Sequence, residues 1–424
     1  MKDKHKLISP ENRLVFILVT ALFFFWGIPN NLNDVLIKQF IKSFELTRFK
    51  AGLIQSAFYM GYFLLAMPAA MLMRKYSYKT GLIVGLVLFG CGCMLFYPAA
   101  QINTYGFFLF ALFVIASGLS FLETGSNSFI SVLGDPETSE QRLNFSQAFN
   151  PIGSISGVGI GTVFIFSGIE LDKAKIAAMK AAGAYQHYLH QETLRVVYPY
   201  MVIGAVVIIW AIILLFTRFP RLAEENEQLA PGQKGHLKEL LKFPHFIKGA
   251  IAQFFYVGAQ VGTWSFFIQY VQDYTRQGEK TAGYLLMGTL VAFMLGRFSA
   301  TYLMKFIKPN KLMGLYSIIN IGLVLISILL PGWVGMIAVF LTSFFMSLMF
   351  PTIFALGVKN LGVNTKLGGS VIIMAIIGGA VLTPVMALVA QKGSMAIAMI
   401  IPLIAYIYIL HYSYLGSKIK SAQN

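Results

Sequence analysis

Long apolar runs separated by short polar segments dominate this chain, and they are the first feature that predicts its structure. A helix needs about 20 predominantly apolar residues to cross a bilayer. Twelve stretches meet that length, with approximate limits 14–42, 49–73, 80–99, 104–133, 144–167, 197–217, 245–272, 281–304, 311–331, 334–358, 367–391 and 393–415. The pattern therefore predicts an all-α integral membrane protein with twelve transmembrane helices.

Two polar segments organise these spans. The longest clearly polar stretch, 218–242, reads RFPRLAEENEQLAPGQKGHLKELLK and follows the sixth span. It predicts a cytoplasmic linker between two six-helix bundles, residues 1–217 and 243–424. A weak internal repeat supports this division, because Leu72-Met73-Arg74 and Leu303-Met304-Lys305 follow the second span of each half. The other segment, 168–196, predicts a short polar-faced helix outside the bilayer.

Composition supports the membrane class. Of the 424 residues, 57% are hydrophobic and 12% charged, and the mean hydropathy is +0.70, whereas soluble domains carry about 25% charge. The net charge of +16 fits basic loops beside membrane spans better than nucleic-acid binding. With the N-terminus inside, inner segments hold 21 basic residues and outer segments 11, which places both termini in the cytoplasm.

Signatures of enzymes and cofactors are missing from the sequence. It contains no Walker-type phosphate loop and no H-E-x-x-H zinc motif. The only cysteines, Cys91 and Cys93, point about 200° apart on a helix, so they make a poor metal pair and no disulfide framework. We expect neither an enzyme nor a bound cofactor, and no metal site.

Two of the seventeen acidic residues, Asp34 and Glu123, fall inside predicted spans. An ionisable group at bilayer depth costs at least ~2.5 kcal/mol and is by default a functional hypothesis. Asp34 lies 21 residues past Arg13, roughly 31 Å of helical rise, and Glu123 lies twelve residues before Asp135, roughly 18 Å. Two carboxyl groups at staggered depths can pass a proton from an outer vestibule towards the inside.

Amides share a helix face with each acid. In the first span Asn30 is four residues before Asp34, and Asn31 three before it. In the fourth span Asn127 is four residues after Glu123. Such polar stripes belong against a water-filled cavity. The alternatives are interhelical hydrogen bonding by the asparagines, for which they are well suited, and a protonated glutamate bonded within the bundle.

A further polar pair accompanies a run of glycines in the fifth span. Gln147 and Asn150 are three apart and face one way, within RLNFSQAFNPIGSISGVGIG. The glycines at 153, 157, 159 and 161 suit either close helix packing or a gating movement, and both interpretations stay open.

The second half offers an aromatic face. Tyr256, Gln260 and Trp264 recur at i, i+4 and i+8 in the seventh span. Aromatic faces stack on sugar C–H surfaces and amides bond hydroxyls, which suits an uncharged polyol, although Tyr and Trp also anchor helices at membrane interfaces. Arg297, within the eighth span, is better explained as a snorkelling or inner-gate charge than as a substrate ligand.

Together the sequence blocks resemble a known family. Six plus six helices around a central linker resemble the major facilitator superfamily. More closely, the chain is similar to the L-fucose–proton symporter family over nearly its whole length, in the blocks NNLNDVLIKQF, AGLIQSAFYMGYF, FLETGSNSF, RLNFSQAFN, YVGAQ followed by TW, MFPTIFALGVKNLG and IIGGAVLTPVM. The resemblance implies two pseudo-symmetric bundles around a central cavity.

The resemblance also implies residue roles. The aspartate and glutamate that serve coupling and sugar recognition in that family correspond to Asp34 and Glu123, and its fifth-span polar residues to Gln147 and Asn150. Some positions depart from the family: E-T-G-S-N-S stands at 123–128 where many relatives read E-T-A-A-N-P. Ala70, Arg74 and Ser77 replace the Gly, Asp and second Gly of the superfamily's inner-loop pattern.

The expected function is proton-coupled uptake of a small neutral sugar, L-fucose or a related hexose, by alternating access in a bacterial inner membrane. Candidate coupling residues are Asp34 and Glu123; candidate sugar-binding residues are Asn30, Asn31, Asn127, Gln147, Asn150, Tyr256, Gln260 and Trp264. The expected partners are the sugar and membrane lipid, with no nucleic acid, and one chain suffices as a monomer. A sodium-coupled or facilitative carrier of the same fold and a non-transporting sugar sensor remain alternatives.

Overall fold

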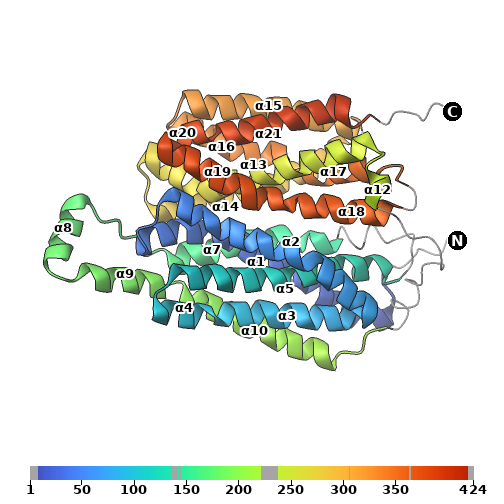
Figure 1. The fold of residues 1–424 in the computed structure, drawn as a ribbon, viewed down its shortest axis with the longest axis horizontal. Helices are drawn as coiled ribbons and strands as arrows, with labels where there is room; N and C mark the ends of the chain where they lie inside the picture. Colours follow the sequence, from blue (N-terminus) through green and yellow to red (C-terminus); the bar gives the residue numbers. More distant parts are fainter. Residues whose placement is uncertain are drawn as a thin grey trace. The chain divides into compact units, whose positions relative to one another are not determined.

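The structure of the chain, a computed structural model, is built from helices throughout the part that it describes (Figure 1). It describes residues 8–134, 142, 145–220, 237–304, 306–361 and 364–418. None of the residues in these ranges lies in a β-strand. The predicted all-α class is therefore confirmed.

The chain divides into two compact units, of which unit 1 comprises Met1–Phe44 and Met60–Pro231. Its core is formed where α1 packs against α7 and α5, and where α3 packs against α5 and α10. Helices α8 and α9 lie beyond one end of this unit (Figure 1). Its helical elements are η1 (Pro10–Asn12), α1 (Arg13–Ser43), the later part of α2 (Arg48–Lys75), α3 (Tyr78–Met94), α4 (Phe96–Ile102), α5 (Tyr105–Val132), α7 (Phe149–Ile160), the π-helix η3 (Gly161–Ile165), α8 (Lys173–Ala181), α9 (Tyr185–Leu194) and α10 (Val197–Phe216).

Unit 2 comprises Glu45–Tyr59 and Gly232–Asn424. Its central helix is α13, which contacts α14, α16, α17, α19 and α21. Its elements are α12 (Leu237–Leu240), α13 (Pro244–Thr275), α14 (Glu279–Leu303), α15 (Pro309–Leu329), α16 (Trp333–Met346), α17 (Met349–Val358), α18 (Thr365–Met374), η5 (Ala375–Ile377), α19 (Gly378–Lys392), α20 (Met395–Ala398), α21 (Ile400–His411) and the π-helix η6 (Tyr412–Gly416).

Helix α2 is shared between the units. Its first turns belong to unit 2, where Gln55 Nε2 donates to Ser265 Oγ at 2.8 Å and Ser56 Oγ donates to the Ala380 carbonyl at 2.7 Å. Its later turns belong to unit 1. The domain boundaries expected at 217 and 243 stay a prediction, because most of the linker, 221–236, lies outside the described residues. Lys305, one residue of the short internal repeat, also lies outside them.

Each of the twelve predicted spans coincides with a helix or a run of consecutive helices. In the described part of the chain, eleven helices are long and apolar enough to cross a membrane. The remaining span is α13, whose 32 residues rise about 48 Å but whose glutamines lower its hydropathy. The same polar content made this span a candidate for sugar binding.

Several spans are interrupted, which the apolar pattern does not reveal. Span three divides at Leu95 into α3 and α4, and span ten divides at Ser347 and Leu348 into α16 and α17. Span five ends in the π-helix η3, and span eleven contains the 3₁₀ turn η5. Such breaks leave backbone carbonyl groups without their usual helical donors.

The prediction of a single helix within 168–196 is wrong, because this segment forms two helices, α8 and α9. Gly183 separates them with a φ of +68°, a conformation that glycine adopts without steric cost. Helix α9 is attached to α1 through Glu192. Its carboxylate lies 3.1 Å from Lys42 Nζ, and Gln39 Nε2 donates to its main-chain carbonyl at 2.8 Å.

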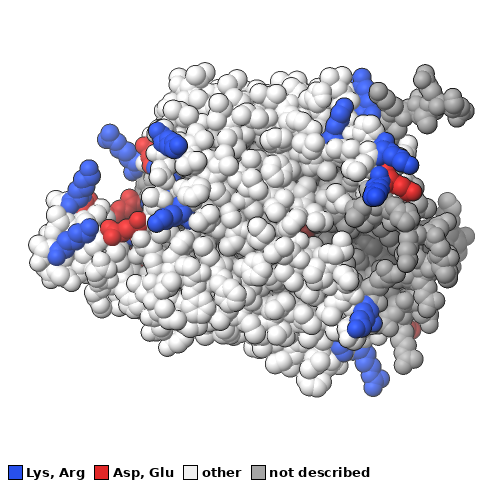
Figure 2. All heavy atoms as spheres, in the orientation of Figure 1, with Lys and Arg blue, Asp and Glu red and all other residues white. Residues whose placement is uncertain are grey.

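The surface has the charge distribution of a membrane protein. In the face shown in Figure 2, Lys, Arg, Asp and Glu side chains gather at the two ends of the helices, and the surface between the ends is almost entirely uncharged. Large apolar side chains are exposed along this region, as on α10 with Val202 at 62%, Ile209 at 57% and Phe216 at 81%. An apolar belt of this kind is what a lipid bilayer covers.

Helices α1 and α7 approach each other through glycine. A Cβ atom added at Gly153 would lie 2.1 Å from the Phe24 carbonyl oxygen, and one added at Gly157 would lie 2.2 Å from that of Ile28. No real Cβ contact is that short, so these positions require glycine. The packing interpretation of the fifth-span glycines therefore holds for these two, and their gating role stays a prediction.

Replacing Gly157 with alanine tests this packing. The added methyl group must push α7 away from α1, and overpacking of this kind costs about 1–3 kcal/mol. We expect a lower unfolding temperature for Gly157→Ala in detergent. The matched control is Gly322→Ala in α15, where an added Cβ meets nothing within 4 Å; equal unfolding temperatures for both variants would contradict the assignment.

Candidate functional site

The polar stripe of the first span lies inside unit 1. Helix α1 continues through Pro29 without ending, so the helical spacing predicted for the stripe is kept. Asn31 and Asp34 are buried, with 5% and 2% of their surfaces exposed. Asn31 Nδ2 donates to Asp34 Oδ2 at 3.0 Å. The carboxyl group is thus held by an amide donor one turn earlier on its own helix.

A tyrosine from α2 connects this helix with the glutamate of α5. The Tyr62 hydroxyl donates to Asn30 Oδ1 at 3.4 Å, and the Glu123 side chain lies within reach of the same hydroxyl. Its single proton serves one of these two acceptors at a time. Tyr62 is 8% exposed, while Asn30 and Glu123 are half-buried. Three helices of unit 1 therefore bring an amide, a phenol and a carboxyl group together.

The position of Tyr62 follows from close packing of α2 on α5. A Cβ atom added at Gly61 would lie 2.7 Å from the Phe113 carbonyl oxygen, so the two backbones touch there. Ser120 Oγ also donates to the Tyr62 carbonyl at 3.3 Å. With its backbone fixed on α5, the Tyr62 side chain has little freedom, and its hydroxyl is directed at Asn30 and Glu123.

The remaining predicted residues of unit 1 form separate contacts. Gln147 Nε2 donates to Asn127 Oδ1 at 3.2 Å, which links the segment before α7 with α5. Gln147 is exposed and Asn127 half-buried. Asn150 Nδ2 instead donates to the Phe23 carbonyl of α1 at 3.3 Å. The structure thus joins Asn127 to Gln147, and it uses the Asn150 amide to hold α7 on α1.

In unit 2 the aromatic members of the predicted face of α13 turn inward. Tyr256 is fully buried and Trp264 is 9% exposed, whereas Gln260 is half-buried. Trp264 Nε1 donates to Ser343 Oγ at 3.0 Å, and its ring packs edge-on against Phe293 with centroids 5.1 Å apart. Rings buried in this way do not fit the alternative that they anchor the helix at a membrane interface.

Arg297 is held inside unit 2 as well. Its Nε donates to the Ser347 carbonyl at 3.3 Å, and its guanidinium lies 4.8 Å from the centroid of the Phe293 ring. Ser347 is where the tenth span breaks, so the arginine satisfies a carbonyl that the break releases. Snorkelling does not describe this contact, and Arg297 stabilises the break between α16 and α17.

Tyr62 is the member of the site that the sequence analysis missed. A signal was present, because Gln55, Tyr59 and Tyr62 recur at i, i+4 and i+7 and so lie on one face of the second span. Because the second span carries no acidic or basic residue at bilayer depth, its sequence did not mark this face as a candidate site. Among the described residues, no group of three or more His, Cys, Asp or Glu side chains is placed to hold a metal ion.

Buried carboxyl groups with fixed amide and phenol partners, in a bundle of membrane-spanning helices, are features of a secondary transporter. The sequence profile of the Major Facilitator Superfamily matches residues 14–383. The chain belongs to this superfamily.

Sequence identity to individual proteins shows to which family within the superfamily the chain belongs. The chain is 42% identical to the L-fucose–proton symporter of Escherichia coli, over 98% of this chain and 96% of that protein. It is 34% identical to the glucose/galactose transporter of Brucella abortus, over 98% of this chain and 97% of that one. Within the superfamily, the chain belongs to the family of these sugar transporters.

A crystal structure of the Escherichia coli fucose–proton symporter matches the fold with a TM-score of 0.71. The match covers 96% of this chain and 99% of that one at 41% identity. The twelve-helix transporter fold expected from the sequence is thereby confirmed.

Proposed function

We propose that this chain takes up a small neutral hexose, L-fucose in the first place, together with protons and by alternating access. The observation that carries the proposal is the pair of carboxyl groups within unit 1, Asp34 bonded to Asn31 and Glu123 within reach of the Tyr62 hydroxyl. The 42% identity to an L-fucose–proton symporter supports both the sugar and the coupling ion.

Protons suit these carboxyl groups better than sodium does. A sodium ion, like other hard cations, binds through several oxygen ligands. The partners of the two acids include donors, the Asn31 amide and the Tyr62 hydroxyl. Donors stabilise a carboxylate in place of a metal ion, and the acid can then gain or lose a proton without rebuilding its surroundings. No cofactor besides the proton is part of the proposal.

Sugar binding is assigned to the amides and the aromatic face. Amide side chains both donate and accept hydrogen bonds, as sugar hydroxyls require. We assign Asn127 and Gln147 to the sugar first, since Gln147 is exposed, and Asn30, Asn31 and Asn150 as further members. In unit 2 we assign Gln260 to direct contact, because it is half-buried. Tyr256 and Trp264 support it from inside the unit.

The topology is part of the same proposal. Bundles 1–217 and 243–424, joined by a cytoplasmic linker at 218–242, give each half six spans. The excess of basic residues in the inner segments, 21 against 11, supports cytoplasmic termini in a bacterial inner membrane. One chain supplies both halves, so the proposed transporter acts as a monomer surrounded by lipid.

Replacing Asp34 with asparagine tests the coupling. The amide has the size of the carboxyl group and its oxygen still accepts from Asn31, but it cannot bind and release a proton. We expect Asp34→Asn to lose accumulation of labelled L-fucose against a gradient in vesicles with an imposed proton gradient. Exchange of sugar across the membrane without a gradient should continue, since it requires no net proton transfer.

The matched control is Asp172→Asn, because the Asp172 side chain only accepts from the Lys175 amide at the start of α8 and asparagine caps a helix equally well. Replacing sodium with choline during uptake should change nothing in the unmodified protein. Accumulation by Asp34→Asn as steep as in the unmodified protein would refute the coupling role. Faster uptake of glucose or galactose than of L-fucose would show that one of those sugars is the substrate.

Replacing Tyr62 with phenylalanine tests the link between α1 and α5. The ring and its packing remain, while Asn30 and Glu123 lose a shared hydrogen bond. A hydrogen bond to a charged group contributes about 1.5–3 kcal/mol, so uptake should fall about tenfold or more. In a Glu123→Gln background the same change should add little, because both substitutions act on one interaction.

Tyr284→Phe serves as the control, since Tyr284 is 54% exposed on α14. Tyr284→Phe should unfold at the same temperature as the unmodified protein, and Tyr62→Phe should remain folded at the assay temperature. Strictly additive losses for Tyr62→Phe and Glu123→Gln would show that Tyr62 does not act through the glutamate.

A further inference from the structure

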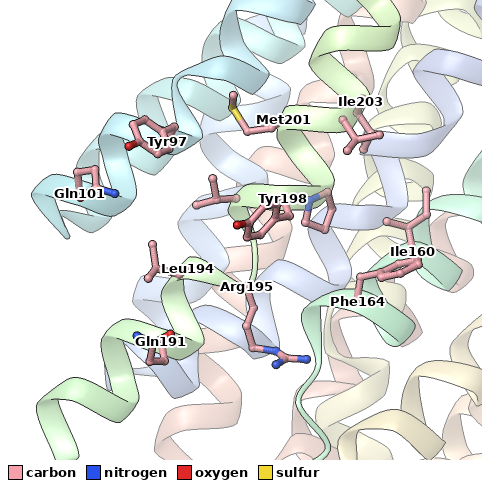
Figure 3. Close-up of a pocket in the computed structure, with 13 residues that line it drawn as sticks. Tyr97, Gln101, Ile160, Phe164, Gln191, Leu194, Arg195, Tyr198, Met201 and Ile203 are labelled. Atoms are coloured by element: carbon pink, nitrogen blue, oxygen red, sulfur yellow. The ribbon is translucent and has the colours of Figure 1, made fainter.

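Unit 1 contains a groove of about 990 Å³ that lies away from the polar cluster around Asp34 and Glu123. It is formed by α4, the end of α7 with η3, and the junction of α9 with α10 (Figure 3). Its lining is mostly apolar and includes Phe164 and Val202. None of the residues assigned above to sugar or proton lines it, so the groove is separate from the proposed transport site.

The apolar wall of the groove continues into the belt that faces lipid. Phe164 is 63% exposed, Val202 62% and Tyr198 80%. These side chains cannot face water at low cost, and along α10 they continue the exposed apolar surface of Ile209 and Phe216. The groove therefore opens towards acyl chains.

The rim of the groove is polar and positively charged. Arg195 is half-buried and directly follows α9, two residues before α10 begins. Its Nε donates to the Ile165 carbonyl at 2.7 Å and its Nη2 to the Phe166 carbonyl at 3.2 Å. These carbonyls carry no net charge, and among the described residues no carboxylate pairs with Arg195. A guanidinium has five N–H donors, so donors remain for a ligand.

Other rim residues favour a headgroup over a sugar or a peptide. Tyr97 and Tyr198 are amphipathic side chains of the kind that lies at the boundary between lipid and water. Gln101 and Gln191 also line the groove, on the side away from Ile160 and Phe164 in Figure 3. A cation with amides at one end and an apolar wall at the other matches an amphiphile with an anionic head.

We propose that this groove binds one phospholipid with an anionic headgroup, its phosphate at Arg195 and an acyl chain along Phe164 and Val202. The charge of Arg195 selects the headgroup, because an anionic lipid supplies the counter-charge that the described residues do not. The bound lipid would cover the π-helix η3 and join it to the start of α10. This site is independent of the proposed transport function.

Native mass spectrometry of the purified full chain with defined lipids tests the site. We expect one molecule of dioleoyl-phosphatidylglycerol to bind, at least about tenfold more tightly than dioleoyl-phosphatidylcholine. Arg195→Gln should weaken phosphatidylglycerol about tenfold, and Arg195→Lys should restore part of the binding because the charge is kept. Inorganic phosphate should not compete, since it lacks the acyl chains.

A matched pair on α10 separates the groove from the general lipid surface. Val202→Trp fills the groove and should abolish the bound lipid, whereas Val206→Trp, one turn further along and 41% exposed, should leave it. Equal retention of phosphatidylglycerol by Arg195→Gln and Val202→Trp would overturn the proposal. So would equal binding of both lipids, absence of a bound lipid, or full competition by phosphate.

Discussion

The cost of a charged carboxyl group at membrane depth is the constraint on which the rest of this structure depends. Unit 1 offsets this cost with hydrogen-bond donors. The Asn31 amide donates to Asp34, and the Tyr62 hydroxyl donates to Asn30 and lies within reach of Glu123. These partners stand on three helices, and short-range contacts hold the helices in place. The glycines where α7 meets α1, and Gly61 where α2 meets α5, allow those contacts. Close helix packing thus holds the carboxyl groups and their hydrogen-bond partners in position.

The two units differ in the groups they bury. Unit 1 holds both membrane-embedded acids, whereas unit 2 holds the aromatic face of α13 and Arg297. The arginine is bonded to the backbone at Ser347 and lies over the Phe293 ring, so it stabilises the break between α16 and α17. Trp264, bonded to Ser343, packs edge-on against the same phenylalanine. The described contacts therefore put the carboxyl groups in unit 1 and the buried aromatic packing in unit 2.

Much of this could be predicted from the sequence, because span length and acid placement are local properties. The twelve spans and the shared face of Asn31 and Asp34 follow from apolar runs and helical periodicity. The role of Tyr62 could not be found in this way, since it depends on how three distant segments pack. Periodicity gives the common face of the α13 aromatics, but it does not show that Trp264 bonds to Ser343. Breaks such as the one at Ser347 occur inside apolar sequence, where hydropathy carries no signal, and Gly183 divides a segment that was expected to form one helix.

We infer that sugar binding changes the protonation of a carboxyl group within unit 1. Difference infrared spectroscopy of the purified protein, recorded with and without L-fucose, measures this directly through the C=O stretch of a protonated carboxyl group. We expect a sugar-induced carboxyl band that disappears in Asp34→Asn or in Glu123→Gln while the sugar still binds. Bound L-fucose without any carboxyl band, or a band unchanged in both variants, would contradict it.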